Sequence, residues 1–185
     1  DNGSNGNNYR GGGIVNYGQG TGKDCSPTIR NCSFSQNTAN EGGGGILNWG
    51  NSGQSNPIIT NCSFSQNTAT FFGGGILNFG SNGQSNPTIT NCSFSQNTAN
   101  NGGGILNWGN SSGQSNPTIT NCSFSQNTAT YGGGILNFGS SGQSDPTIAN
   151  CIFWGAGSGS DVIDNSSATG TLSYSIYDDG TTDGS

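Results

Sequence analysis

Short stretches in which apolar and polar residues alternate recur along the whole chain. Residues 88–90 (Thr-Ile-Thr) and 92–95 (Cys-Ser-Phe-Ser) show this period of two, which predicts β-strands. Helices are not expected, because runs of three or more glycines interrupt the pattern in every repeat and glycine disfavours the helix interior. No regular two-residue hairpin signal separates the stretches. The pattern therefore predicts an all-β protein whose successive strands are not joined as hairpins.

The stretches belong to a repeat of about 30 residues. The sequence Asn-Cys-Ser-Phe-Ser-Gln-Asn-Thr-Ala starts at residues 31, 61, 91 and 121, and a degenerate copy starts at residue 150. Such a repeat predicts a β-solenoid, in which each repeat forms one coil, equivalent residues stack, and the rise is about 4.8 Å. We predict about five to six coils. The chain divides into a polar N-terminal segment (1–10), the β-helix repeats (11–154) and irregular C-terminal coils (155–185).

Asparagine residues mark the expected corners of each coil. Ile89 and Phe94 are an odd number of residues apart, as are Ile105 and Trp108, so a straight strand would place the members of each pair on opposite faces. If both members are buried, the chain must turn between them, and asparagine tolerates the left-handed backbone of such a turn. With a third corner at Asn97, the cross-section is triangular, and partly buried asparagine ladders hydrogen-bond from coil to coil. The predicted corner ladders are Asn31, Asn61, Asn91 and Asn121; Asn37, Asn67, Asn97 and Asn127; and Asn48, Asn78, Asn107 and Asn137.

The same argument predicts which side chains fill the interior and which face outward. The expected core ladders are Cys32, Cys62, Cys92, Cys122 and Cys151; Phe34, Phe64, Phe94, Phe124 and Phe153; and Ile46, Ile76, Ile105 and Ile135. The aliphatic residue after each Gly-Gly-Gly-Ile motif would then point outward as a contact stripe, formed by Val15, Leu47, Leu77, Leu106 and Leu136. An exposed stripe would require a lateral partner or a covering loop. The alternative is that the corner lies elsewhere and these residues are part of the core.

The cysteines allow two interpretations. Ladder cysteines one coil apart lie within disulfide range, but five equivalent members cannot all pair. Buried, reduced cysteines that act as small apolar residues are the favoured interpretation. Cys25 lies outside the ladder and could pair with Cys32.

Composition narrows the chemistry. Charged residues make up 6% of the chain, there is no histidine, and the net charge is −6. Three basic residues are too few to neutralise a nucleic-acid backbone, and without histidine the serine-triad mechanism and histidine-ligated metals are absent. No apolar run approaches the length of a membrane span. We therefore expect no nucleic acid, no membrane span, no metal and no cofactor.

The densest group of charges lies near the C-terminus. Its members are Asp161, Asp164, Asp178, Asp179 and Asp183. They lack the spacing of a calcium-binding loop. We interpret them as a solvated acidic end that limits uncontrolled aggregation of the last coil.

The repeat resembles known families. Gly-Gly-Gly-Ile and Phe-Ser-Gln-Asn are similar to the GGxI and FxxN repeats of chlamydial polymorphic outer-membrane proteins. The longer unit from Asn-Pro-Thr-Ile to Gly-Gly-Gly-Ile resembles secreted bacterial right-handed parallel β-helix repeat proteins. Residues 150–155 and 172–176 are similar to the last coils of the choice-of-anchor subset. The resemblance implies a right-handed, pectin-lyase-like β-helix at the cell exterior.

The function expected first is structural: a secreted, non-catalytic β-helix whose copies stack into an extracellular fibre or surface coat. The alternative is an adhesin or glycan-binding module that uses Trp49, Trp108, Tyr17 and Tyr131 as stacking platforms. Ice binding through the Thr88/Thr90 and Thr118/Thr120 arrays is less expected. A polysaccharide lyase or hydrolase is also less expected, because that chemistry needs paired carboxylates or a carboxylate-held cation and residues 33–144 contain one acid, Glu41.

Overall fold

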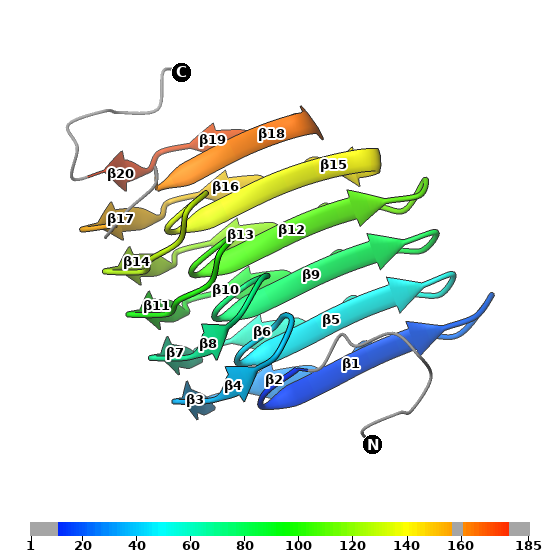
Figure 1. The fold of residues 1–185 in the computed structure, drawn as a ribbon, viewed down its shortest axis with the longest axis horizontal. Helices are drawn as coiled ribbons and strands as arrows, with labels where there is room; N and C mark the ends of the chain where they lie inside the picture. The colour runs from blue at the N-terminus through cyan, green and yellow to red at the C-terminus, as the bar shows by residue number, and fades with distance from the viewer. Residues whose placement is uncertain (1–10, 157–160, 178–185) are drawn as a thin grey trace.

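The computed structural model describes residues 11–156 and 161–177, which form a parallel β-solenoid (Figure 1). Each coil contributes one strand to each of three six-stranded sheets. Sheet 1 consists of β1 (Ile14–Gln19), β5 (Ile46–Asn51), β9 (Ile76–Ser81), β12 (Ile105–Asn110), β15 (Ile135–Ser144) and β18 (Val162–Ala168). Sheet 2 consists of β2 (Thr28–Arg30), β6 (Ile58–Thr60), β10 (Thr88–Thr90), β13 (Thr118–Thr120), β16 (Thr147–Ala149) and β19 (Thr171–Ser173). Sheet 3 consists of β3 (Ser33–Ser35), β7 (Ser63–Ser65), β11 (Ser93–Ser95), β14 (Ser123–Ser125), β17 (Ile152–Trp154) and β20 (Ile176–Tyr177). A fourth, two-stranded sheet pairs β4 (Thr38–Ala39) with β8 (Thr68–Ala69).

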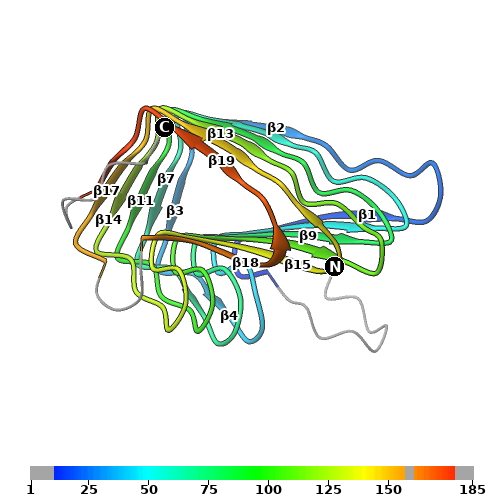
Figure 2. The same cartoon turned by 90° about the horizontal axis from the view of Figure 1, so that it is seen from above.

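Neighbouring coils pair in parallel with equivalent residues opposite each other. Ile14 lies opposite Ile46 in sheet 1, and Phe34 lies opposite Phe64 in sheet 3. Seen along its axis, the solenoid encloses a triangle with one sheet on each side (Figure 2). The prediction of an all-β solenoid with five to six triangular coils is confirmed.

The interior of the triangle is a continuous apolar core. Isoleucines from sheets 1 and 2, phenylalanines from sheet 3 and the corner cysteines form one cluster along the axis. Rings one coil apart stack almost parallel, as Phe64 and Phe94 do at 4.7 Å between centroids. The predicted core ladders lie in this cluster with one exception. Cys32 is exposed, because it belongs to the first coil and no described coil covers it from the other side.

Two of the three predicted corners lie at or next to residues in the left-handed conformation. The corner between sheets 2 and 3 is at the predicted ladder that includes Asn31, Asn61, Asn91 and Asn121, with φ of 54–55°. These side chains are exposed, so the prediction that they are partly buried is wrong: the turn points the amide away from the core.

The second corner falls one residue before its predicted position. Gln36, Gln66, Gln96 and Gln126 have φ of 54–56°. The asparagine that follows each glutamine points inward instead of forming the corner. Asn67, for example, is buried and donates from Nδ2 to Asn97 Oδ1 at 3.0 Å. The ladder of Asn37, Asn67, Asn97 and Asn127 therefore forms the predicted hydrogen bonds beside the corner rather than at it.

The third predicted corner, at Asn48, Asn78, Asn107 and Asn137, is wrong. These residues lie in the middle of straight strands. In β5, Ile46 packs in the interior cluster, whereas Leu47 and Trp49 pack in a second cluster. Asn48 points inward with Ile46 and is buried, and its Nδ2 donates to Asn78 Oδ1 at 2.8 Å. The assumption that isoleucine and tryptophan share one face caused the error, since a buried polar ladder occupies the position assigned to an apolar side chain.

The predicted exposed stripe is also wrong for four of its five members. Leu47, Leu77, Leu106 and Leu136 are at most 3% exposed, and only Val15 remains exposed, at 45%. The glycine-rich segments between sheets 3 and 1 lie outside the outer face of sheet 1 (Figure 2), and Phe72 from one of them packs against the leucine cluster. A Cβ on Gly42 would lie only 2.5 Å from Leu77 Cδ2, so the covering loop approaches this closely only with glycine.

The C-terminal coil continues the solenoid. β18, β19 and β20 extend the three sheets, and Val162 and Leu172 pack against the core. They lie in the region expected to form irregular coils (155–185). The polar N-terminal segment (1–10) lies outside the described residues.

Candidate functional site

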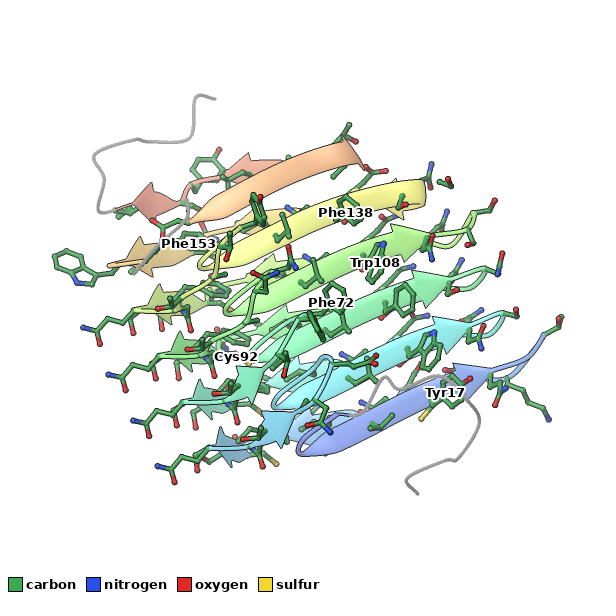
Figure 3. All side chains as sticks on the ribbon, in the orientation of Figure 1. Tyr17, Phe72, Cys92, Trp108, Phe138 and Phe153 are labelled. Atoms are coloured by element: carbon green, nitrogen blue, oxygen red, sulfur yellow. The ribbon has the colours of Figure 1, made fainter. Side chains whose placement is uncertain are left out.

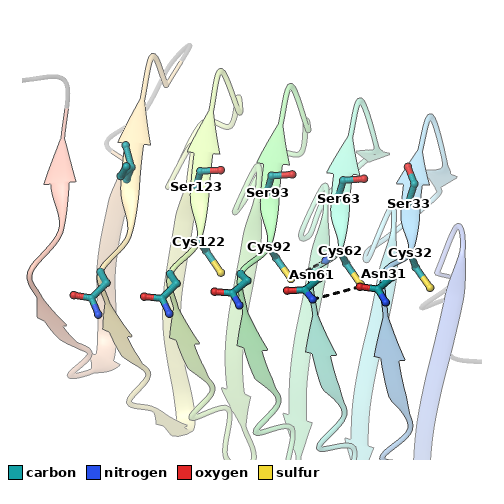
Figure 4. A pocket seen from close by; sticks show the side chains of 14 residues that line it. Asn31, Cys32, Ser33, Asn61, Cys62, Ser63, Cys92, Ser93, Cys122 and Ser123 are labelled. Carbon is teal, nitrogen blue, oxygen red and sulfur yellow. Dashed lines mark hydrogen bonds between the residues drawn. The ribbon is translucent and has the colours of Figure 1, made fainter.

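An open groove of about 820 Å³ follows the corner between sheets 2 and 3. Its walls repeat the Asn-Cys-Ser triplet from coil to coil (Figure 4). Asn150 and Ile152 form its C-terminal end. The amides of Asn61 and Asn31 are linked by a hydrogen bond of 3.3 Å. The groove thus offers amide and hydroxyl groups at each of the first four coils and no charged side chain.

Buried thiols lie beneath the groove. Cys62, Cys92, Cys122 and Cys151 are at most 3% exposed, and each Sγ donates to the carbonyl two residues earlier at 3.2–3.4 Å. Burial raises the pKa of Cys62, and hydrogen bonds to Cys151 and Cys92 raise the pKa of Cys122. These two groups are therefore protonated thiols at neutral pH, which are poor nucleophiles. All six cysteines are free, so the suggested Cys25–Cys32 disulfide is absent.

The outer face of sheet 3 carries two serine columns that end in large apolar residues. Ser123 lies opposite Ile152, and Ser125 lies opposite Trp154. Ile152 and Trp154 are 51% and 64% exposed, whereas Phe153 between them is fully buried. Sequence reasoning missed this pair because residues 150–154 were treated as a degenerate repeat. The same alternation that placed Phe153 inside would have placed its two neighbours outside.

The aromatic residues proposed as stacking platforms form a row on the outer face of sheet 1. Ring centroids are 4.6 Å apart for Tyr17 and Trp49 and 5.9 Å apart for Trp108 and Phe138. Figure 3 shows Tyr17, Trp108 and Phe138 along this face, with Phe72 from a covering loop beside Trp108. Trp49 is 6% exposed, and Tyr17 and Trp108 are half-buried. Trp49 is therefore too buried to be a platform, and of the four candidates Tyr131 alone is well exposed, at 53%.

The threonine array lies on the outer face of sheet 2. Thr88 and Thr118 are exposed neighbours, and the hydroxyls of Thr90 and Thr120 are 3.3 Å apart. The columns are interrupted where Ile58 takes the place of Thr88 and Arg30 that of Thr90. The hydroxyl lattice therefore extends over only part of the sheet.

The described acidic side chains do not converge. Asp24 accepts a hydrogen bond from Ser26 Oγ, and Asp145 accepts one from Thr169 Oγ1 at 2.6 Å. Within residues 11–156 and 161–177, no three potential metal ligands among cysteine, aspartate and glutamate come together. Asp161 is buried, while Asp164, Asp178, Asp179 and Asp183 carry side chains outside the described set. The same residues include no helix long and apolar enough to span a membrane.

One comparison with known proteins gives a match. The family model described as a right-handed beta helix region matches residues 2–177. The match covers every coil and agrees with the expected right-handed winding. No curated protein and no solved structure matches the sequence.

Proposed function

The chain belongs to the right-handed β-helix family, and we propose that it serves as a non-catalytic structural protein whose copies stack end to end. The product would be a filament or coat outside the cell. The observation that carries the proposal is the open edge of all three sheets at both ends of the described solenoid.

In the part of the chain that the structure describes, each end of the solenoid presents one strand edge from each of the three sheets. Among the described residues, β1, β2 and β3 pair only with the second coil, and β18, β19 and β20 pair only with the fifth. Each end therefore presents three strands with N–H and C=O groups directed along the axis. Unpaired strand edges are templates for pairing with another chain. A first coil placed on a last coil repeats the contact already made inside the solenoid, and such a head-to-tail contact propagates without closing.

The distribution of charge along the sequence favours the head-to-tail contact. All three basic residues, Arg10, Lys23 and Arg30, lie within the first 30 residues, which contain two aspartates. Residues 161–185 contain five aspartates and no basic residue. The ends therefore differ in sign, and opposite charges steer association. The coils between carry few charges, so the sides provide no comparable attraction or repulsion.

The non-catalytic and extracellular parts of the proposal have separate support. Acid–base chemistry needs a titratable group oriented by a partner in a cleft, whereas the groove found here is lined by asparagine, cysteine, serine and isoleucine. The placement outside the cell follows from the resemblance to secreted β-helix repeat proteins.

The test is to measure assembly of the full 185-residue chain by electron microscopy and sedimentation velocity. We expect unbranched filaments one solenoid wide whose length increases with protein concentration. They should shorten between about 10 mM and about 1 M salt, since the Debye length falls from roughly 30 to 3 Å. Strictly monomeric particles at every concentration would overturn the proposal.

A charge-reversal variant tests whether charge at the end of the solenoid affects assembly more than charge on its sides. Arg30→Glu places a negative charge on the first coil and should reduce filament length at low salt. The double variant Thr88→Glu/Thr147→Glu changes net charge by the same amount on exposed positions of sheet 2 in the third and fifth coils. It should assemble like the unaltered chain. Equal loss of assembly in both variants would attribute the effect to net charge alone.

A further inference from the structure

We propose that the outer face of sheet 3 and the adjoining groove form a binding site for an uncharged polysaccharide chain, with Trp154 as its aromatic platform. We call this surface the serine face; it comprises the serines of β3, β7, β11 and β14 together with Ile152 and Trp154. The site lies on the side of the solenoid and so goes beyond end-to-end stacking.

Trp154 has no structural task that explains its size. It is the outward neighbour of Phe153, which fills the core position of its coil. All four preceding coils have serine at the same position, as the strand register shows for Ser125, Ser95, Ser65 and Ser35. A 64% exposed indole on a surface of serines is therefore an addition to the repeat. Tryptophan is enriched among the residues that dominate binding contacts.

Further exposed apolar groups lie on the same two coils as Trp154 and its neighbour strand β20. Ile152 and Ile176 lie opposite each other and are 51% and 62% exposed. Tyr174, which precedes β20, is 85% exposed with φ of 50°. Tyr174 occupies the corner position that Asn150 holds in the preceding coil with φ of 53°, so an exposed tyrosine replaces asparagine at a turn that disfavours bulky side chains. Together these residues form an apolar end to a polar surface.

The rest of the serine face supplies free hydrogen-bonding groups. The side chains of Ser63, Ser93 and Asn91 form no hydrogen bond with any described residue. Equivalent groups recur on the four coils that contain β3, β7, β11 and β14, with the spacing of about 4.8 Å between parallel strands. A chain that lies along the axis would therefore meet the same hydroxyl and amide at each step.

These features select the ligand class. Hydroxyls and amides both donate and accept, which matches the hydroxyl groups of a sugar, and an indole packs against the C–H face of a sugar ring. No lysine, arginine, aspartate or glutamate lies on the serine face or in the groove. An anionic polymer would find no cation there and would be repelled by the net charge of −6. An uncharged polysaccharide fits all three observations.

The experiment is affinity electrophoresis of the full chain in native gels that contain hydroxyethylcellulose, dextran or galactomannan, with polygalacturonate as the anionic comparison. We expect at least one neutral polymer to retard the protein and polygalacturonate to have no effect. Trp154→Ala should weaken the retardation by about tenfold or more, because it removes the stacked aromatic surface. Tyr131→Ala deletes another exposed ring, 53% exposed against 64% for Trp154, from a covering loop and should leave binding unchanged.

Three results would overturn the proposal. The first is no retardation by any of the three neutral polymers, and the second is stronger retardation by polygalacturonate. The third is equal binding by the Trp154→Ala and Tyr131→Ala variants, with circular dichroism showing both folded. If Trp154→Ala instead abolishes a lateral dimer in sedimentation velocity, the serine face is a contact between copies. Loss of filaments with retained retardation would separate this site from the stacking proposal.

Discussion

The two apolar clusters of this protein pack their aromatic rings in different geometries. In the interior cluster, phenylalanine rings from successive coils stack 4.7–4.9 Å apart with interplanar angles of 4–8°. In the outer cluster, between sheet 1 and the covering loops, tyrosine, tryptophan and phenylalanine rings stack 4.6–5.9 Å apart at 29–55°. Three sheets fix the cross-section of the interior, so each coil must repeat one side chain. A loop that covers one open face can adapt to different rings.

The largest expected effect is a deletion in the interior. Phe94→Ala should lower the free energy of unfolding by about 3–5 kcal/mol, because rigid sheets cannot close the cavity. Phe79→Ala in the outer cluster should cost at least about 1 kcal/mol less, since a loop can settle into the space. Urea denaturation followed by circular dichroism measures both. Equal losses would mean that the covering loops are as rigid as the sheets.

The comparison of clusters also shows how far sequence reasoning reached. Period-two alternation and the 30-residue repeat determine the solenoid, the interior ladders and the corner at Asn31. They could not predict that Leu47 and Trp49 are buried on the outer face of sheet 1. Alternation shows that a strand has two faces, but it does not show which face packs on the interior and which is covered by a loop. The burial of this outer face depends on where the glycine-rich loops lie. Their position depends in turn on tertiary contacts, such as that of Gly42 with Leu77.

Polar residues caused the remaining errors. Asn48 is fully buried between coils, and Ser85 Oγ donates to its carbonyl at 2.9 Å. Sequence analysis treats asparagine as a turn residue, and nothing local distinguishes Asn48 in a strand from Asn61 at a corner. At Trp154 the alternation around Phe153 indicates an outward side chain even though the repeat is degenerate there.

The second prediction concerns the polar ladder that shares a strand with the outer cluster. Asn78→Ala should lower the free energy of unfolding by about 2–4 kcal/mol, because it leaves a buried donor on Asn48 and a buried acceptor on Asn107 without partners. The matched deletion at the exposed corner is Asn91→Gly. Glycine is used there because the φ of 54° disfavours alanine. Denaturant melts should show a change within about 0.5 kcal/mol for Asn91→Gly; a similar loss at both sites would mean that burial does not distinguish the ladders.

The third prediction tests the loops that cover the outer cluster. Gly73 has a φ of +60°, and a Cβ there would lie 2.3 Å from the carbonyl oxygen of Ile76. Gly73→Ala should therefore cost about 2 kcal/mol, from the left-handed backbone plus the clash. Gly22 has a φ of +73°, and a Cβ there would have no atom within 4 Å. Gly22→Ala therefore measures the cost of the left-handed backbone alone, about 1 kcal/mol. Thermal melts compare the two, and equal costs would show that the loop yields without loss of packing.

The last prediction concerns the reactivity of the cysteines rather than stability. It tests whether the interior of the solenoid is inaccessible to a reagent beyond the first coil. Cys32 is exposed at the first coil, whereas Cys62, one coil further, is 3% exposed in the same motif. Iodoacetamide should modify Cys32 in the native protein and Cys62 only after unfolding, as read by mass spectrometry of peptides. Burial raises the pKa of Cys62 above its ordinary value of 9.0, so Cys62 in the native protein stays a protonated, poorly reactive thiol as the pH is raised toward 9. In the unfolded chain Cys62 regains its ordinary pKa, so its contribution to stability is present below pH 9 and declines as the pH rises further. As a control, Cys32→Ser should remove the fast modification. Rapid modification of Cys62 in the native protein would contradict the prediction, because it would mean that the interior is accessible to the reagent at the second coil.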